Sequence, residues 1–319
     1  MSERTQSKIK FVGLHAHSVA GSIFDGLGFP QDHMEFAYSN GSDALALTDH
    51  GNMNGLSYQV LHAKKMKAEG KDFKPIFGCE AYFIPSIEEW KEEYEQAMLD
   101  KKKARQAKKA GASAASVEDE GASKGKSSNV LRRRRHLVLL AQNQTGLNNL
   151  FKLVSESYKD ENFYRYPRMD YKMLKEYGEG IIASSACLGG VYAGNYWENR
   201  EEGPEAVLEA MRDTTRKMVD VFGDRWHGEI QWNNVPEQHE LNKFVIQVCD
   251  EFGVKVISTA DSHYPNRDAW KDRELYKRLG WLGKGRPQWA DTESELPISV
   301  EEIGYELYPK NGDEMFESY

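Results

Sequence analysis

Residues 10–26 read KFVGLHAHSVAGSIFDG, and they place two histidines at the end of an apolar run. His15 and His17 are two positions apart, so on a β-strand both imidazoles point to the same side. An acid, Asp25, follows a few residues later. Paired histidines at a strand end are also compatible with ordinary hydrogen-bonded surface groups, so their interpretation depends on whether the pattern recurs.

The same pattern recurs at the ends of other apolar runs. His, Asp, Glu or Cys residues close four of them: Asp49 and His50, Glu80, Cys187, and Asp261 and His263. Side chains of these types would repel each other or lack partners if they met in one buried place. Divalent metal ions compensate such groups, because they bind imidazole nitrogen, carboxylate oxygen and thiolate sulfur. The recurrence therefore predicts a metal cluster where several strands end.

Seven short apolar runs alternate with amphipathic stretches. The runs are IKFVGL, DALALT, KPIFGCEAYF, HLVLLA, GIIASSA, GEIQW and VKVIST. Apolar strands that alternate with helices predict an α/β protein with a parallel sheet covered by helices. Seven strands in one unit favour a closed or nearly closed β/α barrel over an open doubly wound sheet, whose glycine-rich dinucleotide turn is missing. In such a barrel the carboxyl ends of the strands form the active-site face.

One segment, residues 88–130, interrupts this alternation. Residues 88–109 are rich in helix formers, with acidic residues early and basic residues late. The Gly-, Ser- and Ala-rich residues that follow predict a flexible loop. We therefore expect a helix and a loop inserted into the barrel. The four arginines at 132–135 are either a solvated charge run or, because His136 follows them, a contact for phosphate.

Length and composition indicate a globular protein with a well-charged surface. The chain has 319 residues, a formal net charge of −8 and three cysteines, too few for a disulfide framework. No apolar run is long enough to cross a bilayer, and residues 1–10 lack the apolar stretch of a signal peptide. We expect a cytoplasmic protein without a membrane partner. The negative net charge argues against general nucleic-acid coating but leaves room for a local basic groove.

Several ordered motifs resemble the polymerase and histidinol phosphatase (PHP) domain, in particular its version at the N-terminus of bacterial DNA polymerase III alpha subunits. The motifs are LHAHS with a later DG, ALALTDHGNM, KPIFGCEAY, RHLVLLAQNQTGLNNL, RMDYKMLKEYGEGIIASSACLGG and VISTADSHY. The resemblance covers roughly residues 8–290 apart from the insertion, and it implies a distorted seven-stranded β/α barrel with up to three metal ions. We expect residues 1–290 to form this domain and residues 291–319 to lead toward a polymerase region that this chain lacks.

The resemblance also implies nine metal ligands in three sets. The first set is His15, His17, Asp261 and a bridging Glu80; the second is Glu80, His136 and Cys187; the third is Asp25, His50 and His263. His136 begins its apolar run, so it enters on the resemblance alone. The thiolate suits Zn²⁺, and the imidazoles and carboxylates suit Mn²⁺, with Fe and Mg²⁺ left open. For Asp49 we expect a role in orienting His50.

The function that the resemblance implies is a metal-dependent phosphoesterase, most specifically a 3′–5′ proofreading exonuclease acting on the 3′ end of DNA. His15, His17, Glu80 and Asp261 would carry catalysis with a metal-activated water. The implied partner is a replicative polymerase or the remainder of the same alpha subunit, and this chain itself is not expected to polymerise. Two alternatives stay open: a small-molecule phosphatase of the histidinol-phosphate type, and a non-catalytic metal-bound module that stabilises a polymerase.

Overall fold

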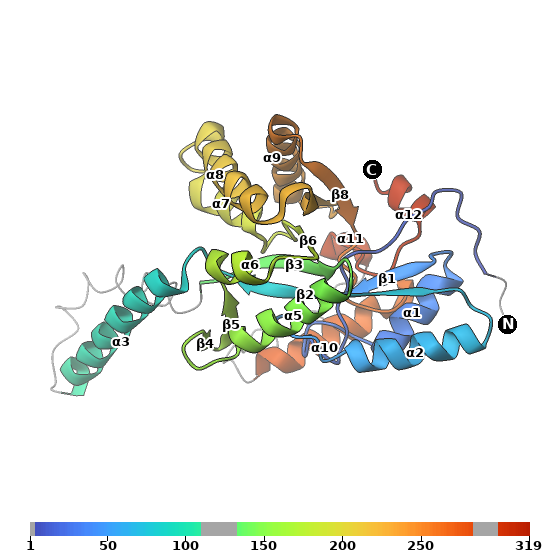
Figure 1. Cartoon of the computed structure of the whole chain (residues 1–319), viewed down its shortest axis with the longest axis horizontal. Coiled ribbons are helices and arrows are strands. Elements are labelled where there is room, and N and C mark those ends of the chain that lie inside the picture. Colours follow the sequence, from blue (N-terminus) through green and yellow to red (C-terminus); the bar gives the residue numbers. More distant parts are fainter. Residues whose placement is uncertain (1–3, 110–132, 283–298) are drawn as a thin grey trace.

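The computed structural model describes residues 4–109, 133–282 and 299–319, and a curled mixed sheet forms its centre (Figure 1). The strands are β1 (Ala44–Leu47), β2 (Lys74–Phe83), β3 (Arg135–Ala141), β4 (Phe163–Tyr164), β5 (Tyr166–Met169), β6 (Ile181–Ser184), β7 (Trp226–Gln231) and β8 (Lys255–Thr259). The helices are α1 (Pro30–Ser39), α2 (Leu56–Ala68), α3 (Ile87–Lys109), α5 (Gln144–Ser157), α6 (Tyr171–Tyr177), α7 (Val191–Asn199), α8 (Pro204–Phe222), α9 (Pro236–Phe252), α10 (Trp270–Leu282), α11 (Val300–Ile303) and α12 (Gly312–Glu317).

The sheet has the strand order β4-β5-β2-β3-β6-β7-β8, and β1 pairs with the first half of β2. The extended segment 13–17 joins its two ends. The Gly13 carbonyl accepts a hydrogen bond from Ala46 N in β1, and the His15 carbonyl accepts one from Ser262 N, just after β8. The sheet therefore curls into the predicted seven-stranded barrel when segment 13–17 is counted with β1, β2, β3, β6, β7 and β8.

The barrel is mixed, which corrects the prediction of a parallel sheet. β3 runs antiparallel to both of its neighbours, β2 and β6, whereas β6, β7 and β8 are parallel to one another. Phe83 at the end of β2 pairs with Arg135 at the start of β3, so the inserted segment connects these strands as a long hairpin would. The short antiparallel pair of β4 and β5, which the apolar runs did not predict, extends the edge.

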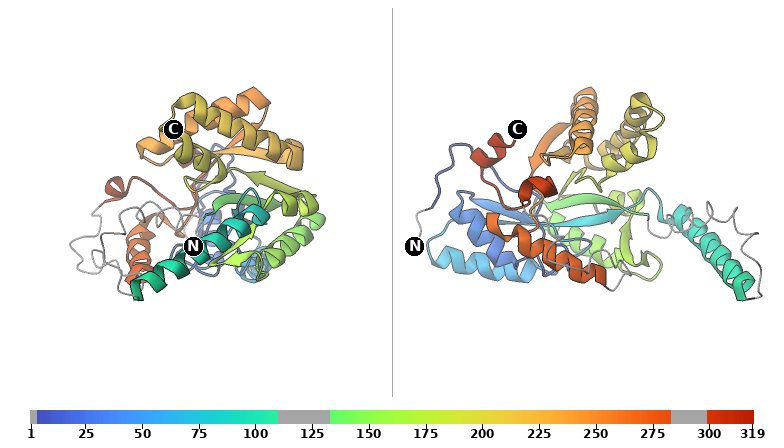
Figure 2. Two further views of the ribbon diagram at one scale, coloured as in Figure 1. Left: turned by 90° about the vertical axis from the view of Figure 1, so that its left-hand side faces the viewer. Right: turned by 180° about the vertical axis from the view of Figure 1, so that it is seen from behind.

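Helices cover the outer face of the barrel and explain why its strands read as continuous apolar runs (Figure 2). Helices α5 to α9 pack over β2, β3, β6 and β7 around a cluster that includes Leu139, Leu150 and Trp226. Helices α1 and α2 cover β1 through Met34 and Met66. Because the outer face is buried in this way, polar side chains on these strands can collect only on the inner face or at the rim.

The predicted inserted helix is confirmed as α3, which extends away from the body of the protein (Figures 1 and 2). Its first turn is anchored, because Ile87 and Trp90 are buried in a cluster with Ile84. The flexible loop predicted after this helix falls within residues 110–132, which lie outside the described residues. The expected domain boundary at residue 290 also lies outside them, so it stays a prediction.

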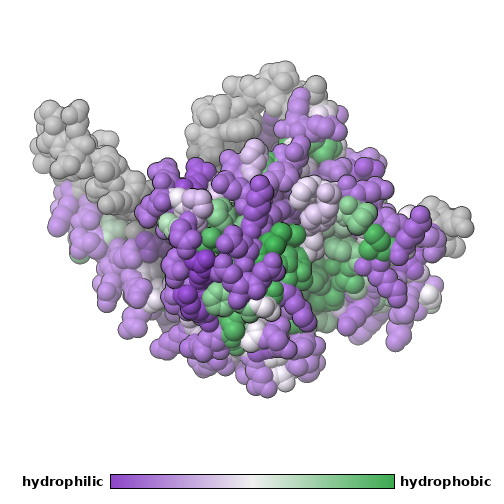
Figure 3. Space-filling view, turned by 90° about the horizontal axis from the view of Figure 1, so that it is seen from above, coloured by the Kyte–Doolittle hydropathy of each residue, from purple (hydrophilic) through white to green (hydrophobic). Residues whose placement is uncertain are grey.

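The C-terminal residues 299–319 pack directly on the barrel. Leu307 and Tyr308 are buried beside Tyr264, and the Asp313 carboxylate accepts hydrogen bonds from two backbone N–H groups near the N-terminus. Hydrophilic residues dominate the face seen in Figure 3, with hydrophobic residues gathered near its centre. Among the described residues, no helix combines the length and apolar character that a membrane span requires.

Candidate metal centre

His15 and His17 lie on the extended segment that joins the ends of the sheet. Ala16 between them is held by Thr48, which accepts from Ala16 N and donates its own N–H to the Ala16 carbonyl. His17 N donates to the Ser262 carbonyl at 2.7 Å. Ala16 packs outward under α1 and α2, so the imidazoles on either side of it turn inward. Both rings are almost completely buried.

Two other strands continue into residues of the cluster. Asp49 and His50 follow β1, and Asp261 and His263 follow β8. Asp261 has a φ of +48°, a left-handed conformation that Asp adopts more readily than most residues. Such backbone strain persists where the surrounding structure enforces it, and here it turns a buried carboxylate toward the histidines.

Glu80 lies inside β2 rather than at its end, which corrects the prediction from the run PIFGCE. β2 continues to Phe83, because its second half pairs with both β3 and β5. Ala81 and Phe83 belong to the outer hydrophobic cluster. By strand alternation Glu80 therefore points into the barrel, where it is fully buried.

His136 and Cys187 reach the site from neighbouring strands of opposite direction. Since β3 is antiparallel to β2 and β6, its second residue, His136, lies at the edge where those strands end. Cys187 follows β6 at that edge, and its Sγ is 3.5 Å from His136 Nδ1. The direction of β3 thus explains why reasoning from strand ends could not find His136.

Asp25 lies on the loop between segment 13–17 and α1. Arg273 of α10 donates to Asp25 Oδ1 at 2.6 Å and to the Asp25 carbonyl at 3.0 Å. The other carboxylate oxygen, Oδ2, lies 3.0 Å from His50 Nε2 and 3.5 Å from His263 Nε2. Arg273 therefore holds the Asp25 carboxylate against two of the histidines.

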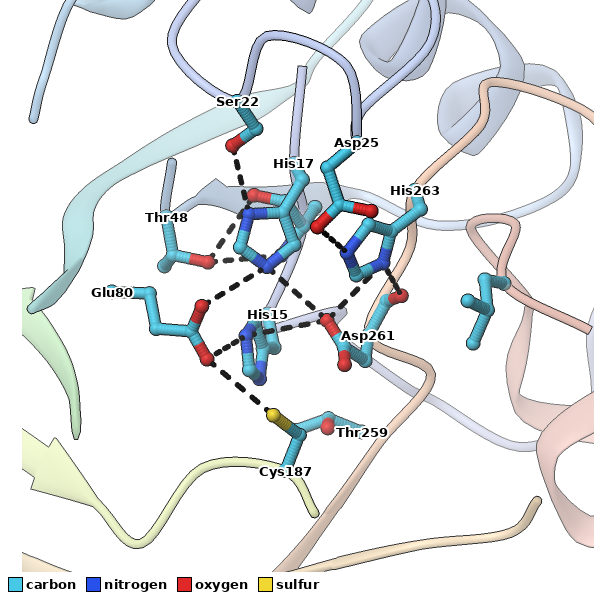
Figure 4. Close-up of polar contacts among 12 residues, drawn as sticks. His15, His17, Ser22, Asp25, Thr48, Glu80, Cys187, Thr259, Asp261 and His263 are labelled. Atoms are coloured by element: carbon cyan, nitrogen blue, oxygen red, sulfur yellow. Dashed lines mark hydrogen bonds and ion pairs between the residues drawn. The ribbon is translucent and has the colours of Figure 1, made fainter. Parts of the chain in front are cut away.

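Glu80 is the hub of the cluster (Figure 4). Its Oε1 lies 3.1 Å from His15 Nε2, 3.1 Å from His136 Nδ1 and 3.7 Å from Cys187 Sγ. Its Oε2 lies 2.5 Å from His50 Nδ1 and 3.6 Å from His17 Nε2. On the opposite side, Asp261 Oδ1 lies 3.3 Å from His15 Nε2 and 3.2 Å from His17 Nε2. All nine residues that the sequence singled out as ligands therefore lie in one connected cluster.

The carboxylates and imidazoles of the cluster shift each other's pKa values. Burial opposes ionisation of Glu80, yet His136, His50 and His15 hold its pKa well below the usual value. Burial likewise opposes protonation of His50, but Glu80 and Asp25 raise its pKa to about 10. Burial, together with the neighbouring His50 and His263, lowers the pKa of His17 to about 3. The carboxylates thus demand compensating positive charge, which divalent cations can supply.

Five buried polar atoms of the cluster make no hydrogen bond with any described residue: His15 Nε2, His17 Nε2, His50 Nδ1, Glu80 Oε2 and Asp261 Oδ1. They approach one another at ion-pair distances but not with hydrogen-bond geometry. Buried polar atoms without partners are costly, and cations among them would satisfy all five. On this observation the residues fit divalent metal ions.

Three groups of ligand atoms lie within 4.8 Å of one another: His15, His17 and Glu80; His50, Glu80 and His136; and His17, His50 and His263. The first group reproduces three members of the first predicted set. In the other two groups, His50 stands where Cys187 was expected and His17 where Asp25 was expected. Cys187 and Asp25 border these groups through their contacts with Glu80 and His50.

Hydrogen bonds on the far side of two rings decide which nitrogen faces the cluster. His263 Nδ1 donates to a backbone carbonyl at 2.7 Å. Ser22 Oγ gives its hydrogen to Asp49, so His17 Nδ1 is the donor in its 3.0 Å contact with Ser22 Oγ. In both rings the Nε2 lone pair therefore points inward, as metal binding requires. Asp49 was expected to orient His50; its carboxylate instead binds Ser22, and so supports His17.

Among the described residues, three that the sequence did not single out make side chain–side chain hydrogen bonds to the nine ligand candidates: Ser22, Arg273 and Glu229 of β7. Glu229 accepts a hydrogen bond from His15 Nδ1 at 2.8 Å. A signal for Glu229 was present, because it is an acid inside the apolar run GEIQW, where an exposed face was not expected. No comparable signal marks Arg273, which is 248 residues away from Asp25 in the chain.

The arginine run is largely engaged in ion pairs. Arg133 donates both terminal nitrogens to Glu93 of α3, at 3.0 and 2.8 Å, and Arg135 pairs with Glu198 of α7. Arg132 lies outside the described residues. Both ion pairs are exposed to solvent, so these two arginines fit the interpretation as a solvated charge run.

Arg134 differs from its neighbours because it lies against aromatic rings at the cluster. Its guanidinium carbon is 3.9 Å from the centre of the Tyr166 ring and 5.4 Å from that of Tyr82. The Tyr82 ring in turn is 5.6 Å from the ring of His136. Because of this position beside the cluster, Arg134 is a candidate for phosphate contact.

His33 is buried outside the cluster but secures the loop that carries Asp25. It lies in the first turn of α1 and is fully buried. Its Nε2 donates to the Leu27 carbonyl at 2.8 Å. Burial lowers its pKa from 6.5 to about 4, so the folded protein keeps this imidazole neutral.

This shift predicts acid sensitivity that His33→Gln should reduce. Between pH 6.5 and about 4 the unfolded chain binds a proton at His33 and the folded chain does not, so stability falls as pH falls through this window. The loss is about 1.4 kcal/mol per pH unit. Urea unfolding of the metal-free protein measures how much free energy of unfolding is lost between pH 6.5 and pH 5. This loss should be about 2 kcal/mol smaller in His33→Gln than in the wild type. Equal losses in both proteins would contradict the assignment, and pH 7 to 8 serves as the control range.

Comparison with known proteins finds similarity over most of the chain. Residues 13–233 match the family model described as PHP domain. The DNA polymerase III subunit alpha of Aquifex aeolicus is 36% identical over 257 residues, which are 80% of this chain and 18% of that protein. That of Thermus aquaticus is 32% identical over 275 residues, 84% of this chain and 18% of that protein. The chain thus spans about a fifth of the length of these relatives.

Among solved structures, an amidohydrolase from Chromobacterium violaceum with bound sulfate and no metal is similar at a TM-score of 0.43 and 14% identity. The match covers 83% of this chain and 96% of that chain.

Proposed function

The chain belongs to the PHP domain family, and we propose that it is a metal-dependent phosphoesterase whose substrate is the 3′ end of DNA. The observation that carries this proposal is the cluster around Glu80, whose two oxygens face five side chains from separate parts of the barrel. Carboxylates that bridge closely spaced cations are typical of sites that hydrolyse phosphoesters.

The proposed ligands are the nine residues of the cluster: His15, His17, Asp25, His50, Glu80, His136, Cys187, Asp261 and His263. Their chemistry, five imidazoles, three carboxylates and one thiol, suits Zn²⁺ and Mn²⁺. When bound, such cations would lower the pKa of a water molecule and offset negative charge on the phosphate.

The chain's own residues have distinct tasks in this proposal. Glu80 joins the ligand groups, because each of its oxygens faces a different pair of imidazoles. Arg273 keeps Asp25 in place on one side of the site. Ser22 keeps the His17 lone pair turned inward. Burial of the cluster limits the number of competing water molecules and strengthens each electrostatic interaction.

DNA as the substrate is supported by the relatives, which are named DNA polymerase III alpha subunits. We infer removal of nucleotides from the 3′ end, in the sense of proofreading. The partner would be a replicative polymerase, present as a separate protein or as the remainder of the same alpha subunit.

Arg134 is the residue that we propose to contact a DNA phosphate next to the scissile bond. Arg134→Ala is expected to raise KM for single-stranded DNA about tenfold, the effect of losing one charge-assisted hydrogen bond. Cleavage of bis(4-nitrophenyl) phosphate, which offers no neighbouring phosphate, should change by less than about twofold. Steady-state kinetics with both substrates measure this split.

Arg133→Ala is the matched control, because it removes a guanidinium of the same run that bonds Glu93 of α3, whereas Arg134 lies against the rings beside the cluster. It should leave KM for DNA near the wild-type value. An unchanged KM for DNA in Arg134→Ala, or equal effects of the two variants, would contradict the assignment.

The direct test of the proposed function is an assay on single-stranded DNA with Mn²⁺ or Zn²⁺ added. With a 5′-labelled oligonucleotide we expect a ladder of products shortened from the 3′ end. With a 3′-labelled one, the label should appear at once as a mononucleotide. The double variant His15→Ala/Asp261→Ala, prepared in the same way, should be inactive, and activity that persists in it would reveal a contaminating nuclease.

Two outcomes would overturn the proposal and select an alternative. Release of phosphate from histidinol phosphate, with DNA left intact, would indicate a small-molecule phosphatase. Bound metal without hydrolysis of either substrate would indicate a module whose metals are structural.

A further inference from the structure

We infer that Glu229 is a positioning residue for the metal site, because it holds His15 with its Nε2 directed at Glu80 and Asp261. The inference rests on the proposed metal site and adds to it a residue outside the nine ligands. Glu229 lies in the middle of β7 and points into the barrel, where it is 2% exposed.

The Glu229 carboxylate is held rigidly by donors from several segments. Its Oε1 accepts from His15 Nδ1 at 2.8 Å, from Thr259 Oγ1 at 2.6 Å and from Gln231 Nε2 at 3.1 Å. Its Oε2 accepts from Ser184 Oγ at 2.5 Å. These donors belong to segment 13–17, β6, β7 and β8, so the carboxylate is fixed by the barrel wall itself.

This fixed acceptor decides how His15 can act. With Nδ1 donating to Glu229, the other nitrogen, Nε2, lies 3.1 Å from Glu80 Oε1 and 3.3 Å from Asp261 Oδ1. The opposite tautomer would place the Nδ1 lone pair against a carboxylate oxygen, which is repulsive. A carboxylate behind a ligating imidazole also makes that imidazole a better electron donor to a cation.

The charge of Glu229 points to this role more than to a packing role. Burying a carboxylate is costly, and at lower cost a neutral amide could accept the three hydrogen bonds made to Oε1 and donate its own hydrogen to Ser184 Oγ. The rings of His17 and His263 have neutral acceptors behind them, a serine hydroxyl and a backbone carbonyl. His15, which lies between the carboxylates of Glu80 and Asp261, has a full negative charge behind it.

Two variants separate the charge from the hydrogen bond. Glu229→Gln can keep an acceptor for His15 and place its NH₂ group toward the Ser184 hydroxyl, so it removes mainly the charge. Glu229→Ala removes both. Isothermal titration calorimetry of the metal-free chain with Mn²⁺, without DNA, should show affinity about 10–100-fold weaker for Glu229→Ala, with Glu229→Gln between it and the wild type.

The matched control is Thr215→Val in α8, which removes a buried hydroxyl bonded to Tyr192 away from the site. It should lower the unfolding temperature and leave Mn²⁺ affinity unchanged. If Glu229→Ala does not fold, Glu229→Gln decides alone: weaker binding at an unchanged unfolding temperature supports the role.

The inference would be overturned if Glu229→Gln, and Glu229→Ala where it folds, bound Mn²⁺ as tightly as the wild type. It would also be overturned if Thr215→Val lost as much Mn²⁺ affinity as the Glu229 variants. A wild-type chain that binds Mn²⁺ but leaves DNA intact would remove the proposed substrate and leave the role of Glu229 standing. A wild-type chain that binds no Mn²⁺ would overturn both.

Discussion

Glu80→Gln is expected to lower the rate of DNA hydrolysis by at least about a thousandfold, equivalent to about 4 kcal/mol of transition-state stabilisation. The reason is the position of Glu80 as hub: its two oxygens face four imidazoles and one thiol. An amide keeps the shape of the side chain, but it replaces one ligand oxygen by an NH₂ group that cannot bind a cation. It also removes the negative charge that draws cations to the site.

The control for this variant is Glu201→Gln, an equivalent change on the exposed turn after α7. Its rate should stay within about twofold of the wild type, as expected for a surface position away from the site. The measurement is the initial rate on a 5′-labelled oligonucleotide at saturating Mn²⁺. A Glu80→Gln protein with more than a tenth of the wild-type rate would contradict the bridging role.

Metal binding is expected to stabilise the fold by about 4 kcal/mol when the free cation is present at a thousand times its Kd. The five buried atoms without hydrogen bonds, and the carboxylates that now depend on protonated imidazoles, all gain partners when cations bind. Since these side chains come from segment 13–17, β2 and the residues that follow β1 and β8, the cations would tie the barrel together. For a chain of this size, the unfolding temperature should rise by roughly 6 °C.

Thermal unfolding in EDTA and after reloading with Mn²⁺ or Zn²⁺ measures this effect. The double variant His15→Ala/Asp261→Ala provides the control, and its unfolding temperature should respond little to metal. Identical unfolding temperatures of the wild-type chain with EDTA and with each metal would contradict a buried cation site.

The part of the fold that could be predicted is the part that hydrophobic pattern alone determines. Each of the runs from DALALT to VKVIST coincides with a strand. The runs are apolar because the outer helices bury one face of the sheet and the barrel interior buries the other. His15 and His17 were placed correctly on one side, because strand alternation is local geometry. Helix α3 was found for the same reason, since its composition is helical whatever it packs against.

What could not be predicted depends on contacts between distant residues. The reversed direction of β3 follows from the hairpin-like connection through the insertion, and nothing local in the run HLVLLA encodes it. That reversal brings His136 to the site. From the sequence, the assignment of His136 as a ligand rested on the resemblance alone. The sequence pattern placed Glu80 at a strand end, whereas pairing with β3 and β5 extends β2 to Phe83. This pairing is a tertiary effect, so the local sequence did not reveal it.

The supporting residues were the hardest to foresee. Arg273 reaches Asp25 from α10 across 248 residues, and a surface-type residue in an amphipathic helix carries no sign of such a contact. Glu229 was visible as an acid within an apolar strand, but its partner could be identified only once segment 13–17 was seen to close the barrel.

The most direct test of the central claim, that these nine side chains hold divalent cations, is anomalous diffraction from crystals grown with Zn²⁺ or Mn²⁺. We predict anomalous peaks beside both oxygens of Glu80, with zinc about 2.0–2.3 Å from the nitrogen, oxygen and sulfur ligands. An electron density map at saturating metal in which Glu80, His15 and His50 keep their places and no anomalous peak lies among them would contradict it.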